Sequence, residues 1–196
     1  ATSNALTTSA YFLGFAVGCL LVPPWLLRIG HIRVFGVLVA MATAVLLTIS
    51  LVVELPVWLA LRFVYGIALS GIYLTVESWL NAETRLEHRG AILSIYAFVT
   101  LFAMFGAQVL LQALQLDDTT FLVMAAIGIS LAALPIGLTR REAPRVVTRP
   151  QFSVRALLNP GNLPAFASGA LAGTFWALAP VYTARIGMDG SGTARF

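Results

Sequence analysis

The sequence predicts an all-α fold, a bundle of membrane-spanning helices, from its composition and from the grouping of its apolar residues. Hydrophobic residues make up 59% of the 196 residues and charged residues only 10%, whereas a soluble domain is about 45–50% apolar and about 25% charged. The apolar residues gather in six blocks: Tyr11–Leu27, Val34–Val53, Leu55–Val76, Ala91–Leu116, Phe121–Leu138 and Leu163–Ala184. Each block is long enough, or nearly so, to cross a hydrocarbon layer of about 30 Å as a helix. Because these runs lack the alternation of barrel strands, six transmembrane helices are predicted.

The first helix contains Gly14 and Gly18, four residues apart, a spacing that lets helices approach closely in lipid. The same spacing recurs at Gly169 and Gly173 in the last helix. We expect both pairs to pack within one chain rather than to form a dimer surface. The two prolines of Pro23–Pro24 either bend the first helix or end it.

The distribution of arginine predicts how the helices are oriented. Arginine supplies all twelve basic residues, and the first, third and fifth connections hold most of them: Arg28, Arg33, Arg85, Arg89, Arg140, Arg141, Arg145, Arg149 and Arg155. The other connections carry Glu54, Asp117 and Asp118 but no arginine. The positive-inside rule therefore places the Arg-rich connections in the cytoplasm and both ends of this sequence outside it. The net charge of +4 thus reports orientation in a membrane, and we expect no nucleic-acid partner.

The longest connection, residues 139–162, contains five arginines and three prolines. Such a stretch does not cross a membrane, and it predicts a cytoplasmic linker between two helical bundles.

The third helix carries the strongest functional signal. Arg62, Gly66, Ser70, Tyr73 and Glu77 fall within about 80° of one another around a helix axis. Ionisable groups inside a membrane cost free energy and mark candidate functional sites. We expect this stripe to face protein or water. The alternatives are an Arg62 that extends to the outer headgroups and a Glu77 that only marks the interface.

Two other helices supply further candidates for a substrate or coupling-ion path. Gln108 and Gln112 share one face of the fourth helix, where they either bond to a neighbouring helix or line an aqueous path. Trp176 and Tyr182 lie on a broad face of the last helix, although aromatic residues there are more often packing or interface residues.

Residues typical of catalysis are missing from the sequence. The two histidines, His31 and His88, are assigned to separate cytoplasmic connections, and neither has metal-ligand spacing around it. No glycine-rich phosphate loop or nucleophile elbow is present. We therefore expect no metal, no cofactor and no enzyme activity.

Several motifs are similar to those of the major facilitator superfamily, whose members have twelve helices in two halves. The turn "PWLLRIGHIR" keeps Arg28, Gly30 and a displaced Arg33 of the signature between the second and third helices, but Leu27 replaces its aspartate. "RFVYG", from Arg62, matches the signature of the fourth helix. "SAYFLGFAVG", "ESWLN", "RGAILSIYAF" and "ALAPVYTARIG" resemble the YcaD branch, whose substrates are not established as a class.

The resemblance implies a membrane transporter fragment that covers the family's second to seventh helices. Residues 1–138 would be most of the N-terminal half, 139–162 the central linker and 163–196 the first helix of the C-terminal half. It implies a monomer that moves a small solute by alternating access, with H⁺ as the usual coupling ion. The alternatives are a non-transporting membrane sensor or scaffold and, less favoured, a membrane-embedded enzyme.

The signature turn and the charged segment after the third helix together suggest a cytoplasmic gate. The gate residues are Arg28, Gly30, Arg33, Glu77, Arg85 and Arg89. Glu77 is expected to pair with Arg89 or Arg85 when the inner face is closed. The exclusive use of arginine with abundant alanine and glycine is typical of GC-rich bacterial genomes, so we expect a bacterial inner membrane.

Overall fold

The computed structural model describes residues 2–52, 54–114, 117–139 and 159–185. Within them the chain is helical and contains no strand, which confirms the predicted all-α class. The long helices are α1 (Thr2–Ile29), α2 (His31–Leu51), α3 (Leu55–Glu83), α4 (Arg89–Leu114), α5 (Asp118–Gly137) and α7 (Leu163–Arg185). Two short 3₁₀ helices, η1 (Leu86–His88) and η2 (Pro160–Asn162), precede α4 and α7.

Five of the described helices, α1 to α5, are long and apolar enough to cross a membrane. They coincide with the first five apolar blocks, and the sixth block coincides with α7. Most of the predicted linker, residues 140–158, lies outside the described residues.

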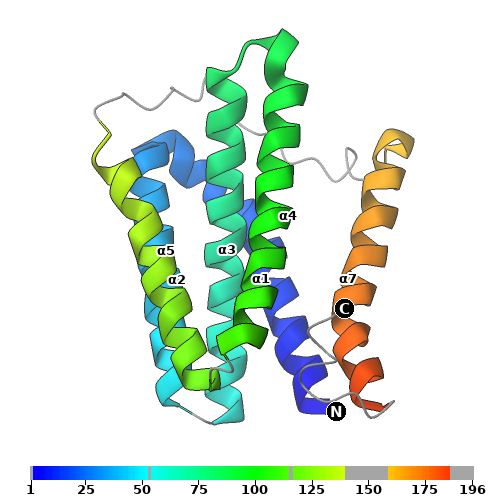
Figure 1. The fold of residues 1–196 in the computed structure, drawn as a ribbon. Helices are drawn as coiled ribbons and strands as arrows, with labels where there is room; N and C mark the ends of the chain where they lie inside the picture. Colours follow the sequence, from blue (N-terminus) through cyan, green and yellow to red (C-terminus); the bar gives the residue numbers. More distant parts are fainter. Residues whose placement is uncertain (1, 53, 115–116, 140–158, 186–196) are drawn as a thin grey trace.

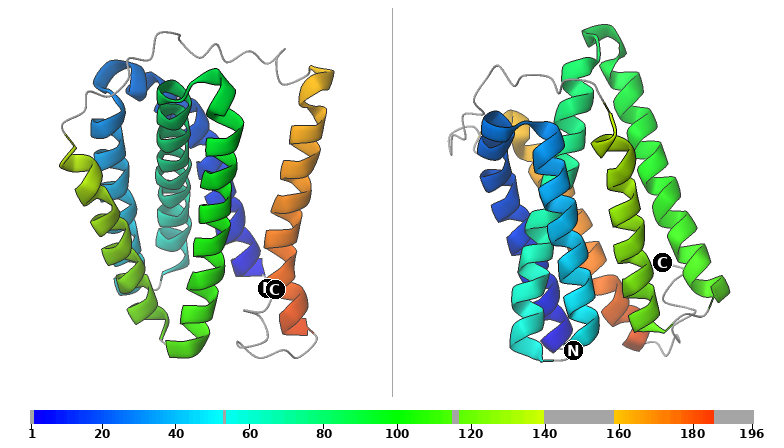
Figure 2. Two further views of the ribbon diagram at one scale, coloured as in Figure 1. Left: turned by 45° about the horizontal axis from the view of Figure 1, so that its top comes forward. Right: turned by 90° about the vertical axis from the view of Figure 1, so that its left-hand side faces the viewer.

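Successive helices from α1 to α5 run in alternating directions, as their short connections require (Figure 1). Helices α2 and α5 lie side by side on one flank, and α3 lies between that flank and α4 (Figures 1 and 2). The most extensive contacts join α1 to α3, with further contacts from α2 to both α3 and α5. Helix α3 is therefore the central element of the described bundle.

The turn between α1 and α2 consists of Gly30 alone, whose φ of 82° lies in the left-handed region that favours glycine. Its N–H donates to the carbonyl of Leu26 at 3.1 Å, and its carbonyl accepts from Val34 at 3.2 Å. The predicted tight turn at Gly30 is confirmed. The two prolines of Pro23–Pro24 lie inside α1, so they do not end that helix.

Asp117 caps the start of α5 at the opposite end of the bundle. Its carboxylate accepts from the Thr120 backbone N–H at 3.0 Å and from the Thr120 hydroxyl at 2.6 Å. These two hydrogen bonds hold the pKa of Asp117 below its usual value. The acidic residue therefore satisfies helix N–H groups at the membrane surface.

The buried core joins the halves of α1, α2 and α3 that lie nearest the Gly30 turn. It is formed by Val22, Leu26, Val34 and Leu38, with Ile72 and Leu74 of α3 packed against it. A hydrogen bond of 2.9 Å between the hydroxyls of Thr43 and Ser130 ties α2 to α5.

The Thr43–Ser130 bond is expected to contribute little to stability. Hydrogen bonds between membrane helices average about 0.6 kcal/mol, because the separated helices also find partners. A double-mutant cycle with Thr43→Val and Ser130→Ala should give a coupling of that size in reversible unfolding of the full-length protein. As a control, Thr48 donates to the Ala44 carbonyl of its own helix, so Thr48→Val should show no coupling to Ser130→Ala. A coupling free energy above about 2 kcal/mol would contradict the expectation that the Thr43–Ser130 hydrogen bond contributes little to stability.

Candidate functional site

Helices α1 and α3 meet along a seam of small residues, where their backbones lie in contact. A Cβ atom added to Gly14 would overlap the backbone carbonyl of Phe63, and one added to Gly66 would overlap the carbonyl of Tyr11. One added to Gly18 would overlap the hydroxyl of Ser70. The predicted packing of the Gly14 and Gly18 pair within one chain is confirmed.

The seam explains where two members of the predicted polar stripe point. Gly66 and Ser70 are buried against α1, and the Ser70 hydroxyl donates to the carbonyl of Ile67 at 3.1 Å. Both residues therefore face protein. Gly169 and Gly173, by contrast, have open space where a Cβ would lie.

Arg62 lies on α3 at the outer end of this seam and is partly buried. Its Nε atom is fully buried and has no hydrogen-bond partner among the described residues. The phenols of Tyr11 and Tyr65 lie within electrostatic reach of its guanidinium, and their ring centroids are 6.2 Å apart. Because a buried donor without a partner costs free energy, Arg62 is available to bind a polar or anionic group.

The polar groups continue along α3 toward its inner end. Tyr73 lies within electrostatic reach of Tyr11, Tyr65 and Tyr96, and Tyr96 within reach of Glu77. We call this set the polar track: Tyr11 from α1, Arg62, Tyr65, Tyr73 and Glu77 from α3, and Tyr96 from α4. The track places phenols and two charges along the central helix from Arg62 to Glu77, a composition that can bind a polar solute.

Sequence patterns identified three members of the track and missed three. Tyr65 follows Arg62 by three residues and so adjoins it on the helix surface, a signal that could have been used. Tyr11 and Tyr96 belong to other helices, and nothing within their own segments distinguishes them from packing aromatics.

Of the other predicted path residues on α4 and α7, two are exposed and two have side chains that are not described. Gln108 is exposed on α4, and Tyr182 is exposed on α7. The side chains of Gln112 and Trp176 lie outside the described part of the chain. Groups of three or more metal-binding side chains are absent from the described residues.

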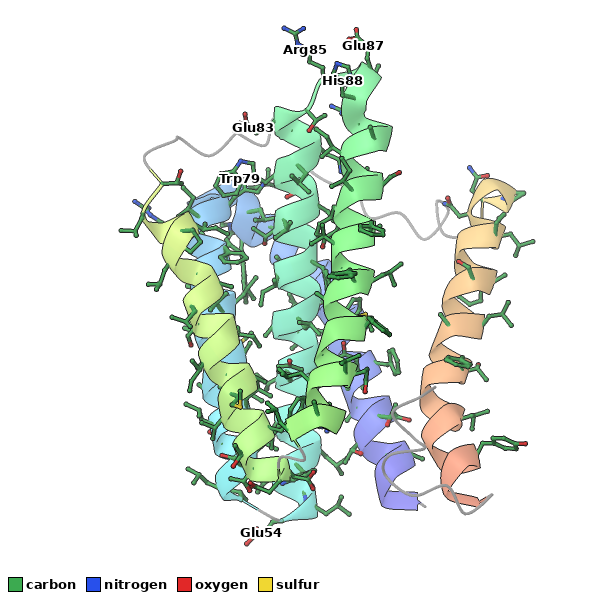
Figure 3. The ribbon with its side chains drawn as sticks, in the orientation of Figure 1. Glu54, Trp79, Glu83, Arg85, Glu87 and His88 are labelled. Atoms are coloured by element: carbon green, nitrogen blue, oxygen red, sulfur yellow. The ribbon has the colours of Figure 1, made fainter. Side chains whose placement is uncertain are left out.

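The charged residues of the predicted gate gather at one end of the bundle. Figure 3 shows Arg85, Glu87 and His88 at the tip of the α3–α4 hairpin, with Glu54 at the opposite end of α3. Arg28, Arg33 and Glu77 are exposed.

Arg89 is partly buried, and its Nε donates to the backbone carbonyl of Thr84 at 3.3 Å. Within the described residues, no recorded ion pair joins Glu77 to Arg85 or Arg89. The expected gate pairing is therefore not formed in this arrangement of the chain.

His31 differs from its sequence-based assignment to a cytoplasmic connection. It is the first residue of α2 and is 0% exposed. Its Nε2 lies 2.9 Å from the hydroxyl of Ser78, and its ring centroid lies 6.0 Å from that of Trp79. The glycine turn directs His31 inward against α3. The periodicity of residues within one segment does not indicate this orientation. His88 is exposed in η1, as the sequence suggests.

Comparison with known families gives one match that covers most of the chain. The family model described as "Sugar (and other) transporter" matches residues 1–147. No solved structure matches the chain.

Curated bacterial proteins are similar over nearly the whole chain. The "Uncharacterized MFS-type transporter YcaD" of Escherichia fergusonii is 26% identical over 95% of this chain and 50% of its own length. An "Uncharacterized MFS-type transporter" of Yersinia pseudotuberculosis is 29% identical over 94% of this chain and 50% of its own length. The "Uncharacterized MFS-type transporter YcaD" of Salmonella heidelberg is 28% identical over 93% of this chain and 49% of its own length. The chain thus spans about half the length of the curated relatives it matches.

Proposed function

Because the chain belongs to the sugar (and other) transporter family, a branch of the major facilitator superfamily with YcaD-like relatives, we propose that the full-length protein is a secondary transporter. It moves a small solute by alternating access, in which two helical halves rock about a site near the middle of the membrane. Helices α1 to α5 belong to the N-terminal half, residues 139–162 form the linker, and α7 opens the C-terminal half. The protein is a monomer in a bacterial inner membrane, with its Arg-rich connections in the cytoplasm.

The observation that carries this proposal is the buried Nε of Arg62, which has no hydrogen-bond partner among the described residues and lies near two phenols. A guanidinium in an apolar bundle is retained only where a ligand, a counter-charge or water satisfies it. The phenols can donate or accept hydrogen bonds, so the site suits a solute with an acidic or strongly polar group. We therefore assign Arg62 to substrate or proton coupling and the phenols of the polar track to orienting the solute.

The test is a substrate screen on the complete protein in proteoliposomes, with and without an imposed pH gradient. The expected result is saturable uptake of a small polar solute that is accelerated by the gradient. Uptake that is saturable but insensitive to the gradient would refute proton coupling and leave a uniporter. A folded protein that transports none of a broad set of sugars, carboxylates and amines would favour the sensor or scaffold reading instead.

The cytoplasmic gate proposed from the sequence is testable by charge exchange. If Glu77 pairs with Arg89 in the inward-closed state, Glu77→Arg and Arg89→Glu should each lower transport on the order of two- to fivefold, the value of an exposed ion pair of up to about 1 kcal/mol. The double exchange should restore much of the loss in initial uptake rates.

The matched control is Glu87→Gln, which neutralises an exposed acid at the tip of the same hairpin and should leave uptake unchanged. A double exchange that is no better than the single variants would refute the pairing.

A further inference from the structure

The inner ends of α2 and α3 are joined by a buried histidine that has no part in the polar track. His31 is fully buried, its Nε2 contacts the hydroxyl of Ser78, and its Nδ1 is buried without a hydrogen-bond partner among the described residues. Trp79 packs beside the ring and lies next to the start of α2 in Figure 3. The histidine directly follows the glycine turn, so this contact holds the turn against α3.

The hydrogen bonds of Ser78 determine which nitrogen of His31 carries the proton. The Ser78 hydroxyl donates to the backbone carbonyl of Thr75 at 3.1 Å. A hydroxyl has one hydrogen, so its oxygen accepts from His31 Nε2. The imidazole is then the neutral Nε2–H tautomer, and Nδ1 is left as a bare acceptor.

Protonation would change this contact in a defined way. The imidazolium carries a hydrogen on both nitrogens, and the new Nδ1–H would be a charged donor buried without an acceptor. Burying a charged donor without an acceptor is strongly unfavourable. The protonated ring is thus stable only if the contact opens and water reaches Nδ1.

The charged groups around the contact do not compensate for a buried imidazolium. The charged groups closest in sequence to His31, Ser78 and Trp79 are Arg28 on α1, Arg33 on α2, and Glu77 and Glu83 on α3, and each is exposed. The described inner end of α5, residues 134–139, has no ionisable side chain. The two arginines oppose a further positive charge, and the exposed carboxylates are screened by water.

We propose that His31 is a positioning residue that holds the α1–α2 turn against α3 only while its imidazole is neutral, so that cytoplasmic acidification releases the turn. The sign follows from the neutral tautomer: the contact is present above the ordinary histidine pKa of about 6.5 and is lost as the pH falls below it. Arg28 and Arg33 flank this turn, so its release would move two basic residues of the proposed gate.

Tryptophan fluorescence tests the contact without any knowledge of the substrate. In the full-length protein with every tryptophan except Trp79 replaced by phenylalanine, the indole is expected to become hydrated when the contact opens. Its emission should shift to longer wavelength, and quenching by acrylamide should increase, as the pH falls from 8 to 5. The midpoint should lie below about pH 6.5, because the contact favours the neutral ring. Emission that does not change over this range would overturn the proposal.

Variants separate His31 from other titrating groups. His31→Gln retains an amide donor for Ser78 but does not titrate, so the acid transition should disappear. His88→Gln is the matched control because His88 is exposed, and the transition should persist in it. Ser78→Ala removes the acceptor, so at pH 8 its emission should already resemble that of the acidified wild type. An unchanged transition in His31→Gln, or no change at pH 8 in Ser78→Ala, would contradict the assignment.

A second experiment, which measures transport, links the His31 contact to the proposed function. Of the two experiments, only this one rests on the proposed function. At a constant pH gradient, the ratio of initial uptake at an internal pH of 5.5 to that at 7.5 should be the same in the wild type and in His88→Gln but different in His31→Gln. Equal pH profiles in all three proteins would refute a role for His31 in the transport cycle. The fluorescence result does not depend on transport. A failure of the His31 proposal can therefore be distinguished from a failure of the proposed transport function.

Discussion

Replacement of Arg62 by alanine is expected to reduce transport by roughly 10- to 100-fold, the largest functional effect of any single change in this chain. Hydrogen bonds to charged groups contribute about 1.5–3 kcal/mol, and each 1.4 kcal/mol is about a factor of ten in affinity. Arg62 is the only arginine among the described residues with a buried nitrogen that has no hydrogen-bond partner. Initial uptake rates of the full-length variant in proteoliposomes measure the loss, at equal amounts of monodisperse protein.

Two further variants show whether Arg62 acts by its charge or by its shape. Arg62→Lys keeps the charge but loses the planar fork that binds an acidic group through two hydrogen bonds, so we expect only partial activity. Glu54→Gln removes a charge at the same outer end of α3, where Glu54 is exposed, and should leave transport unchanged. Uptake at the wild-type rate in Arg62→Ala would refute the assignment of Arg62 to the transport path.

Replacement of Gly66 by alanine is expected to give the largest loss of stability. The added methyl group would overlap the Tyr11 carbonyl, which is backbone and cannot rotate away, so α1 and α3 would have to move apart. Overpacking of a tightly packed contact costs typically about 1–3 kcal/mol. Gly14→Ala should behave alike, because its methyl would meet the Phe63 carbonyl. Thermal unfolding in detergent, followed by the loss of monodisperse protein in size-exclusion chromatography, measures the effect.

The control for the seam is a glycine in a similar helix with open space around it. Gly128 of α5 has no atom within 4 Å of the position of an added Cβ, and alanine is favoured over glycine in a helix by up to about 1 kcal/mol. Gly128→Ala should therefore leave the midpoint of unfolding unchanged or raise it. A Gly66→Ala protein as stable as Gly128→Ala would show that the α1–α3 seam is looser than the structure indicates.

Patterns within single segments were sufficient to predict the helices and one site of close helix packing. Apolar block length predicted α1 to α5, and the four-residue glycine spacing predicted the close approach at Gly14 and Gly18. These predictions succeeded because helix formation in lipid depends on local composition and backbone hydrogen bonding. The same glycine spacing at Gly169 and Gly173 has no close neighbour among the described residues, because spacing allows an approach but does not supply the partner helix.

The candidate site was only partly predictable for the same reason. Arg62, Tyr73 and Glu77 stood out because charge and phenols recur on one face of α3, whereas Ser70 shares that face but points into the α1 seam. Tyr11 and Tyr96 belong to other helices and enter the polar track from there. Which aromatic residues of those helices lie at the track depends on the rotation of each helix about its own axis.

By itself, then, the sequence determined the helical class, the segments that can cross a membrane and the polar stripe of the third helix, all of which follow from composition and periodicity along one segment. Tertiary structure alone decided that phenols from three helices lie near Arg62 or Glu77, that Ser70 packs against α1, and that His31 is buried against Ser78 and Trp79. Those outcomes depend on the rotation of each helix about its own axis, which is determined by side-chain packing between segments distant in the chain.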